Sequence, residues 1–158
     1  MTENYLSILE DSLKEKLEIT AKIREYNSLQ SEALQPEQVD LEKFDKCADE
    51  KSKLIERLTT LDKGFETLYQ KIAGELKENR QKYGAQIKHL QELITRVTED
   101  SMTIQAQEAR NKKMVEEYFR RERSNIGQSR RNSKAAYDYY RNVNKLNSVA
   151  PQYLDSKK

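Results

Sequence analysis

The sequence predicts an all-α protein, built as an elongated antiparallel bundle of three long helices with coiled-coil-like packing. Charged residues make up 35% of the 158-residue chain, the same share as hydrophobic residues, which suits a long, narrow core better than a thick one. The abundant Glu, Lys, Leu, Gln and Arg favour helices, because these side chains lose little freedom there. Only four glycines and two prolines are present to interrupt such helices.

The first predicted helix covers residues 4–34. It contains no glycine or proline, and one face repeats leucine at spacings of three and four residues: Leu6, Leu9, Leu13 and Leu17. This spacing is typical of an amphipathic helix. Pro36 disfavours helical geometry in the residue before it, so we expect the chain to reverse direction at about residues 35–39.

The second predicted helix covers residues 40–74. Asp40 is a suitable N-cap, and Val39 and Phe44 are placed to form a hydrophobic staple around it. An apolar seam with a seven-residue repeat follows: Leu41, Phe44, Ala48, Ile55, Leu58, Phe65, Tyr69, Ile72 and Leu76. Such a repeat favours antiparallel helices packed at shallow angles.

The third predicted helix covers about residues 80–125, with Gly127 just beyond its end. Its seam includes Leu90, Leu93, Val97, Ile104, Met114 and Tyr118. We expect the second reversal within residues 73–84, where Gly74 and Gly84 flank a very polar stretch. Two alternatives stay open: the second and third helices run together, or the break falls at residues 62–64.

The third predicted helix is longer than the first. At 1.5 Å per residue it would measure roughly 65 Å against roughly 46 Å, so it passes the end of the first helix near Asn111. Apolar side chains continue beyond that level: Met114, Val115, Tyr118 and Phe119. They are either ordinary core or an exposed, adaptable groove for a partner helix.

The chain is predicted to divide into a bundle domain, residues 1–127, and a basic, tyrosine-rich tail, residues 128–158. Residues 1–109 hold 16 Lys and Arg against 22 Asp and Glu, whereas residues 110–158 hold 13 against 5. One side of a tail helix would carry Ala136, Tyr139, Tyr140, Val143 and Leu146. A helix this short is marginal alone, so we expect a flexible or conditionally helical tail that folds on the bundle, on a second copy or on a partner.

Catalysis and cofactor binding are not indicated by the sequence. His89 is the only histidine and Cys47 the only cysteine, and neither lies in a metal-ligand spacing or near a phosphate-binding glycine loop. We therefore expect no enzyme activity, no cofactor and no metal. The N-terminus shows no secretion signal and no stretch suited to membrane insertion, so we expect a cytoplasmic protein.

Three segments give the chain a resemblance to a known family. The sequences IQAQEARNKKMVEEYF in the third predicted helix, AAYDYYRNVNK in the tail and the ending YLDSKK resemble the FlgN-type flagellar type III export chaperones, to which the small helical FliT chaperones are related. The resemblance implies a cytoplasmic protein that binds the C-terminal helical region of the hook–filament junction proteins FlgK and FlgL. It would keep them unassembled and deliver them to the type III export gate.

The resemblance also implies where partners bind. The client would lie on the C-terminal half of the third helix, at Gln107, Asn111, Met114, Val115, Tyr118 and Phe119. Tail tyrosines would contact the gate protein FlhA, with Tyr137, Tyr139 and Tyr140 as candidates, and Val143 and Leu146 share the tail stripe. Two alternatives remain: a self-associating coiled-coil scaffold that forms a homodimer through the same residues, and a basic-tail nucleic-acid-binding regulator. Nucleic acid is the less favoured partner, because most of the chain is acidic.

Overall fold

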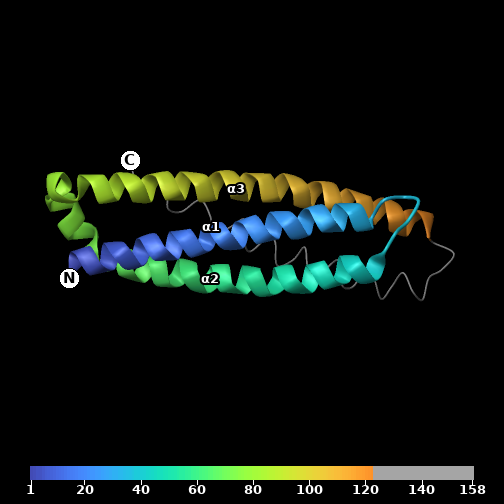
Figure 1. Ribbon diagram of the computed structural model, residues 1–158, viewed down its shortest axis with the longest axis horizontal. Coiled ribbons are helices and arrows are strands. Elements are labelled where there is room, and N and C mark those ends of the chain that lie inside the picture. The colour runs from blue at the N-terminus through green and yellow to red at the C-terminus, as the bar shows by residue number, and fades with distance from the viewer. Residues whose placement is uncertain (123–158) are drawn as a thin grey trace.

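The computed structural model describes residues 1–122 and consists there of three long helices with no strand (Figure 1). They are α1 (Thr2–Ala33), α2 (Leu41–Glu78) and α3 (Arg80–Arg121). The chain runs up, down and up along a single elongated bundle. The predicted all-α, three-helix fold is confirmed.

The reversal between α1 and α2 occurs where Pro36 and Asp40 predicted it. The Asp40 carboxylate accepts a hydrogen bond from the Lys43 amide at 3.0 Å, as an N-cap does. The Asp40 amide donates to the Ala33 carbonyl at 2.7 Å, which ties the two ends of the loop together. The loop extends past the end of α1 beside the end of α3 (Figure 1).

The break between α2 and α3 lies at Asn79, inside the predicted range of residues 73–84. It does not lie at a glycine: Gly64 and Gly74 are within α2, Gly84 is within α3, and none has a positive φ. Asn79 instead departs from helical geometry (φ −120°, ψ 44°), and its amide and side chain both donate to the Glu75 carbonyl at 3.0 Å. The predicted end of the second helix at residue 74 was thus four residues early, and α3 ends at Arg121 rather than near residue 125.

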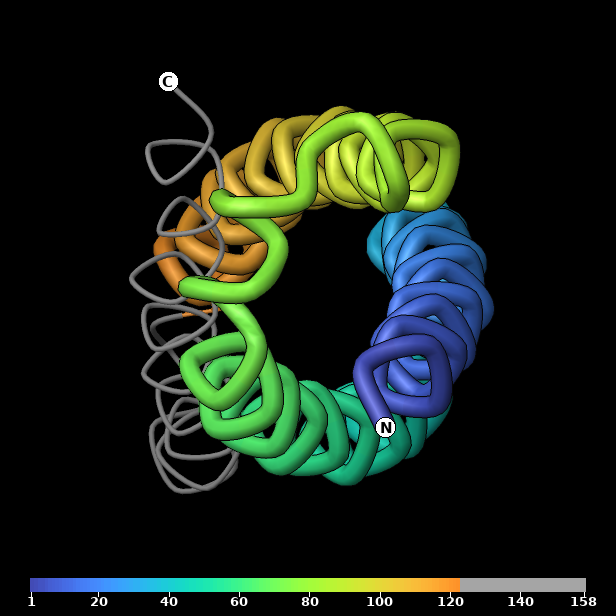
Figure 2. The backbone as a smooth tube through the Cα atoms, turned by 90° about the vertical axis from the view of Figure 1, so that its left-hand side faces the viewer, coloured from blue at the N-terminus to red at the C-terminus, as the bar shows by residue number. Residues whose placement is uncertain are grey.

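Helix α1 lies between the other two helices. It packs against both α2 and α3 along its length, whereas α2 and α3 scarcely approach each other. The view along the bundle shows this arrangement, with α1 between α2 and α3 (Figure 2). The fold therefore rests on two helix–helix interfaces, both made by α1.

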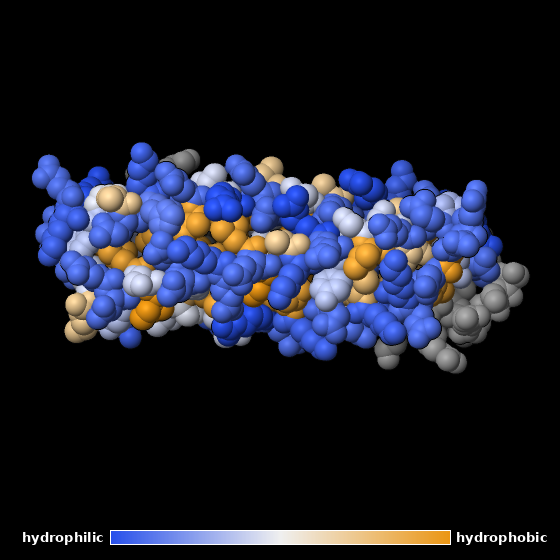
Figure 3. All heavy atoms as spheres, in the orientation of Figure 1, coloured by the Kyte–Doolittle hydropathy of each residue, from blue (hydrophilic) through white to orange (hydrophobic). Residues whose placement is uncertain are grey.

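The core is divided into three apolar clusters along the axis. One lies toward the α2–α3 turn and includes Leu9, Phe65 and Leu93; a central one includes Ile23, Leu58 and Ile104; the third lies at the end of α3. On the face shown in Figure 3, apolar surface is visible only as patches between rows of polar side chains. This is the long, narrow core expected from the composition.

Candidate partner-binding surface

The cluster at the end of α3 forms where the α1–α2 loop meets the last turns of α3. Four of its side chains are buried: Ala33, Leu34, Phe44 and Val115. Four more pack against them and are only partly buried: Val39, Leu41, Met114 and Phe119. We call these eight residues the α3 end cluster. It joins residues from all three helices and the loop at one end of the bundle.

Val115 and Asn111 do not belong to an exposed strip. Val115 is 5% exposed and Asn111 is 1% exposed, so of the two alternatives left open for Val115, ordinary core or exposed groove, the structure shows ordinary core. Val115 is covered by Leu34, Phe44 and Ala33, because the α1–α2 loop reaches beyond α1. The comparison of helix lengths had not included that loop.

Gln107 and Asn111 hold α3 to α1. The Asn27 side-chain amide donates to Gln107 Oε1 at 3.1 Å, and the Asn111 amide donates to the Asn27 carbonyl at 3.0 Å. A buried polar group is costly unless it is hydrogen-bonded. Here the Asn27 side-chain amide is paired with Gln107, and the Asn111 side-chain amide is paired with the Asn27 carbonyl. Their contacts in this structure are structural, and any contact with a partner needs this interface to open.

Met114, Tyr118 and Phe119 remain partly accessible on α3. Met114 Sδ lies 3.9 Å from the Ser31 hydroxyl, and the rings of Tyr118 and Phe119 meet edge to face with centroids 5.6 Å apart. Burial raises the pKa of Tyr118, and the neighbouring Glu122 raises it further. The phenol therefore stays neutral and can donate a hydrogen bond.

An open hollow of about 600 Å³ lies beside Tyr118. Its lining comes from the α1–α2 loop and the start of α2: Gln38, Val39, Asp40, Leu41 and Glu42. Val39 and Leu41 are the apolar residues of this lining, and Asp40 and Glu42 are the acidic ones. These loop residues were not among the predicted site residues, although the staple position of Val39 indicated that it packs near a helix end.

The remaining predicted site residues, Tyr137, Tyr139, Tyr140, Val143 and Leu146, lie outside the residues that the structure describes. So does the predicted tail domain, residues 128–158. Of the predicted α3 residues, Met114, Val115 and Phe119 belong to the α3 end cluster, and Tyr118 borders it. Gln107 and Asn111 lie farther back, in the α1–α3 interface.

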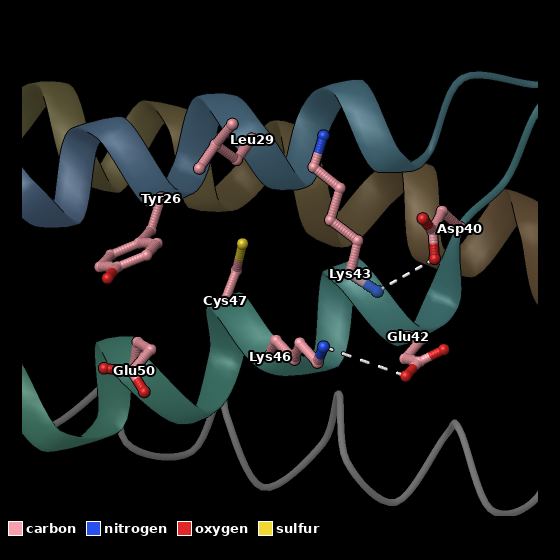
Figure 4. Close-up of a pocket in the computed structure, with 8 residues that line it drawn as sticks. All are labelled: Tyr26, Leu29, Asp40, Glu42, Lys43, Lys46, Cys47 and Glu50. Atoms are coloured by element: carbon pink, nitrogen blue, oxygen red, sulfur yellow. Dashed lines mark hydrogen bonds and ion pairs between the residues drawn. The ribbon is translucent and has the colours of Figure 1, made fainter.

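A second hollow, of about 370 Å³, lies between α1 and the start of α2 (Figure 4). Tyr26, Leu29 and Cys47 form its apolar part, and charged side chains including Lys43, Lys46 and Glu50 surround them. Burial raises the pKa of the Cys47 thiol, an effect that Lys51 and Lys43 only partly oppose. Because the thiolate is the reactive form, this shift disfavours the reactive form of Cys47, which is 6% exposed and packs as a small apolar residue.

Two charged layers cross the core, and the sequence did not predict them. The Lys51 ammonium donates to Asn27 Oδ1 at 2.5 Å and to Glu108 Oε1 at 2.8 Å, and Lys16 donates to Asp62 at 2.5 Å. Burial lowers the pKa of Lys51 to about 8, with Glu108 opposing that shift, and raises the pKa values of Glu108 and Asp62. The apolar clusters are thus separated by hydrogen-bonded charges at fixed positions.

His89 Nε2 pairs with Glu10 at 2.6 Å on the bundle surface, and no group of three or more His, Cys, Asp or Glu within residues 1–122 is arranged to hold a metal ion. None of the three helices in this part of the chain is long and apolar enough to cross a bilayer. Comparison with protein-family models, curated proteins and solved structures gave no match.

Proposed function

We propose that the protein is a FlgN-type export chaperone of the bacterial flagellum. In this proposal it binds the C-terminal helical region of FlgK or FlgL in the cytoplasm, prevents premature assembly and delivers the client to the gate protein FlhA. No nucleotide or cofactor takes part. The observation that carries the proposal is the partly open α3 end cluster, in which Met114 and Phe119 are partly accessible, together with the hollow lined by the neighbouring Tyr118.

The chemistry of this end suits an amphipathic helix. Methionine and aromatic side chains adapt to different apolar partners, and such a helix binds by inserting its apolar stripe into a groove. The Tyr118 hydroxyl supplies a hydrogen-bond donor, while Asp40 and Glu42 at the hollow and Arg120 and Arg121 on α3 supply charges of both signs. Such a surface favours a helix over a small molecule.

Release of the client requires modest affinity. The α3 end cluster is small and half-open, and the neighbouring α1–α3 contacts at Gln107 and Asn111 are hydrogen bonds rather than apolar packing. A client that opens this interface to reach Val115 has to offset the lost contacts, which lowers its net affinity. Delivery to the gate would then use a tail tyrosine, for which Tyr137, Tyr139 and Tyr140 are the candidates.

Titration calorimetry with the full chain and a peptide from the C-terminal region of FlgK tests the proposal. Met114→Ala should weaken binding about tenfold, because burying a methionine contributes about 1.5–3 kcal/mol. Met102→Ala is the matched control, since Met102 lies on the same helix but is 65% exposed. No binding by the wild-type chain at micromolar concentrations, or equal losses in both variants, would refute the proposal.

Self-association is the alternative that the same surface allows. An apolar cluster at one end could pair with its copy across a two-fold axis. Light scattering over a range of protein concentrations distinguishes the two, because a scaffold must form dimers at working concentration. A monomer that binds the FlgK peptide supports the chaperone.

A further inference from the structure

We propose that residues 132–147 pack as a fourth helix between α2 and α3, on the side of the bundle turned away from α1. We call this side the α2–α3 face; on the flank of α2 it is marked by Asp45, Asp49, Ser52 and Glu56, and on the flank of α3 by Thr98, Ser101 and Gln105. The occupant is a segment of the chain that follows the described residues. This inference does not depend on the proposed chaperone function.

The geometry of the three helices leaves this face for another element. Hydrogen bonds between α1 and the α3 residues Asp100, Gln107 and Asn111 show which side of α3 meets α1. By helical position Thr98 and Gln105 lie on the opposite flank. Because α2 and α3 scarcely approach each other, a helix lying between them would close a four-helix bundle, in which every helix has two packed neighbours.

The segment has the pattern that such a position requires. Ala136, Tyr139, Tyr140, Val143 and Leu146 lie on one side of a helix, at the spacing of a buried stripe. Sixteen residues of helix measure about 24 Å, enough to run back from the end of α3 along its second half. The residues between Arg121 and Asn132 can span up to about 33 Å, so the connection imposes no strain.

Charge favours this side of α2 over the other side. Residues 1–122 hold 21 Lys and Arg against 25 Asp and Glu, whereas residues 132–147 hold Lys134, Arg141 and Lys145 against a single acidic residue, Asp138. The flank of α2 away from α1 carries three acidic residues, Asp45, Asp49 and Glu56. The hollow on the α1 side is more nearly balanced, because Lys43 and Lys46 lie there among Asp40, Glu42 and Glu50. Burial and the nearby Asp49 raise the pKa of Asp45, so a basic segment beside this pair would stabilise both carboxylates.

The same packing separates the three tail tyrosines. Tyr139 and Tyr140 lie on the stripe and would face the bundle, whereas Tyr137 lies about 120° from the centre of the stripe and would stay on the outer side. Arg141 and Lys145 lie opposite the stripe, so their attraction to the bundle acts at longer range and is weakened by salt. Tyr137 is then the tyrosine left free for an external partner.

Paramagnetic relaxation in the full chain tests the packing. A spin label is attached at Asp49→Cys, on the α2–α3 face, or at Glu25→Cys, on the outer side of α1, each with Cys47→Ala so that one thiol remains. Both acidic residues are exposed, and they lie at similar levels of the bundle, since Lys51 binds Asn27. The label at position 49 should remove most of the amide signal intensity of residues 136–146, and the label at position 25 should leave most of it.

A second pair of variants tests the orientation of the stripe. Tyr140→Asp should restore the signals in the chain labelled at position 49, and Tyr137→Asp should leave them broadened, while the helical circular dichroism of the bundle stays the same in both. Equal broadening from the two labels, or none from either, overturns the proposal. Broadening that occurs only in mixtures of spin-labelled and isotope-labelled chains also overturns it, because the occupant would then be a second copy.

Discussion

The buried layer around Lys51 provides a sharp test of the packing. Lys51 is 0% exposed, and its ammonium contacts Asn27 on α1 and Glu108 on α3. Lys51→Met keeps the length of the side chain but leaves the Glu108 carboxylate, 4% exposed, without its lysine. Removing one partner of a buried ion pair costs about 3–5 kcal/mol.

That loss is a large share of the total stability. A domain of this size has a free energy of unfolding of about 6–18 kcal/mol, at 0.05–0.15 kcal/mol per residue. Urea denaturation followed by circular dichroism measures the loss as a lower midpoint with an unchanged m-value. Lys51→Met/Glu108→Leu should recover most of it, since no buried carboxylate then lacks its lysine, although Asn27 Oδ1 still loses a donor.

Lys53→Met is the control for this experiment. Its side chain is 72% exposed and pairs with the nearby Glu50 at 3.2 Å, so its effect should be within about 0.5 kcal/mol. A Lys51→Met variant as stable as Lys53→Met would mean that Lys51 does not lie in the core. The three-helix register built on it would then be wrong.

Two further predictions follow from the same structure. The pKa of Lys51 is lowered from 10.5 to about 8, so above pH 8 the folded state binds fewer protons than the unfolded state. The free energy of unfolding of the wild type should therefore rise with pH between about 8 and 10.5, relative to that of Lys51→Met. If the two proteins show parallel pH profiles, the assignment of this pKa to Lys51 is wrong. Gly74→Ala and Gly84→Ala should each stabilise the chain by about 0.5–1 kcal/mol, because both glycines are inside helices and an added Cβ would meet no neighbouring atom within 4 Å. Thermal unfolding measures this effect. If either substitution destabilises the chain, the break between α2 and α3 lies at that glycine.

Local signals in the sequence were sufficient for the fold. Leucine spacing predicted α1, and Pro36 and Asp40 predicted the first reversal, because both act through their own backbone and close neighbours. The second reversal was located only within a range, since glycine is tolerated inside a helix that packs along its length. Asn79 ends α2 through bonds to Glu75 that a search for glycine does not find.

The candidate site was predicted less completely, because it depends on contacts between distant residues. Lys51 falls on the seam between Ala48 and Ile55, yet lysine is ordinarily exposed, and its partner Glu108 lies 57 positions away. The burial of Val115 depends on the path of a loop, which helix lengths do not give. The apolar character of Met114 and Phe119 was visible in the sequence, but their neighbours Val39 and Leu41 were not assigned to the site.

The most direct measurement of the proposed binding mode is hydrogen exchange by mass spectrometry, with and without the FlgK C-terminal peptide. The α1–α2 loop, residues 34–40, and the last turns of α3, residues 112–121, are at the ends of helices, where amides exchange readily. If the client binds at the α3 end cluster, exchange should slow in these two segments and stay the same at the opposite end, in residues 75–90. Slower exchange only in residues 75–90, or no change at the α3 end cluster with the peptide bound, would contradict the account.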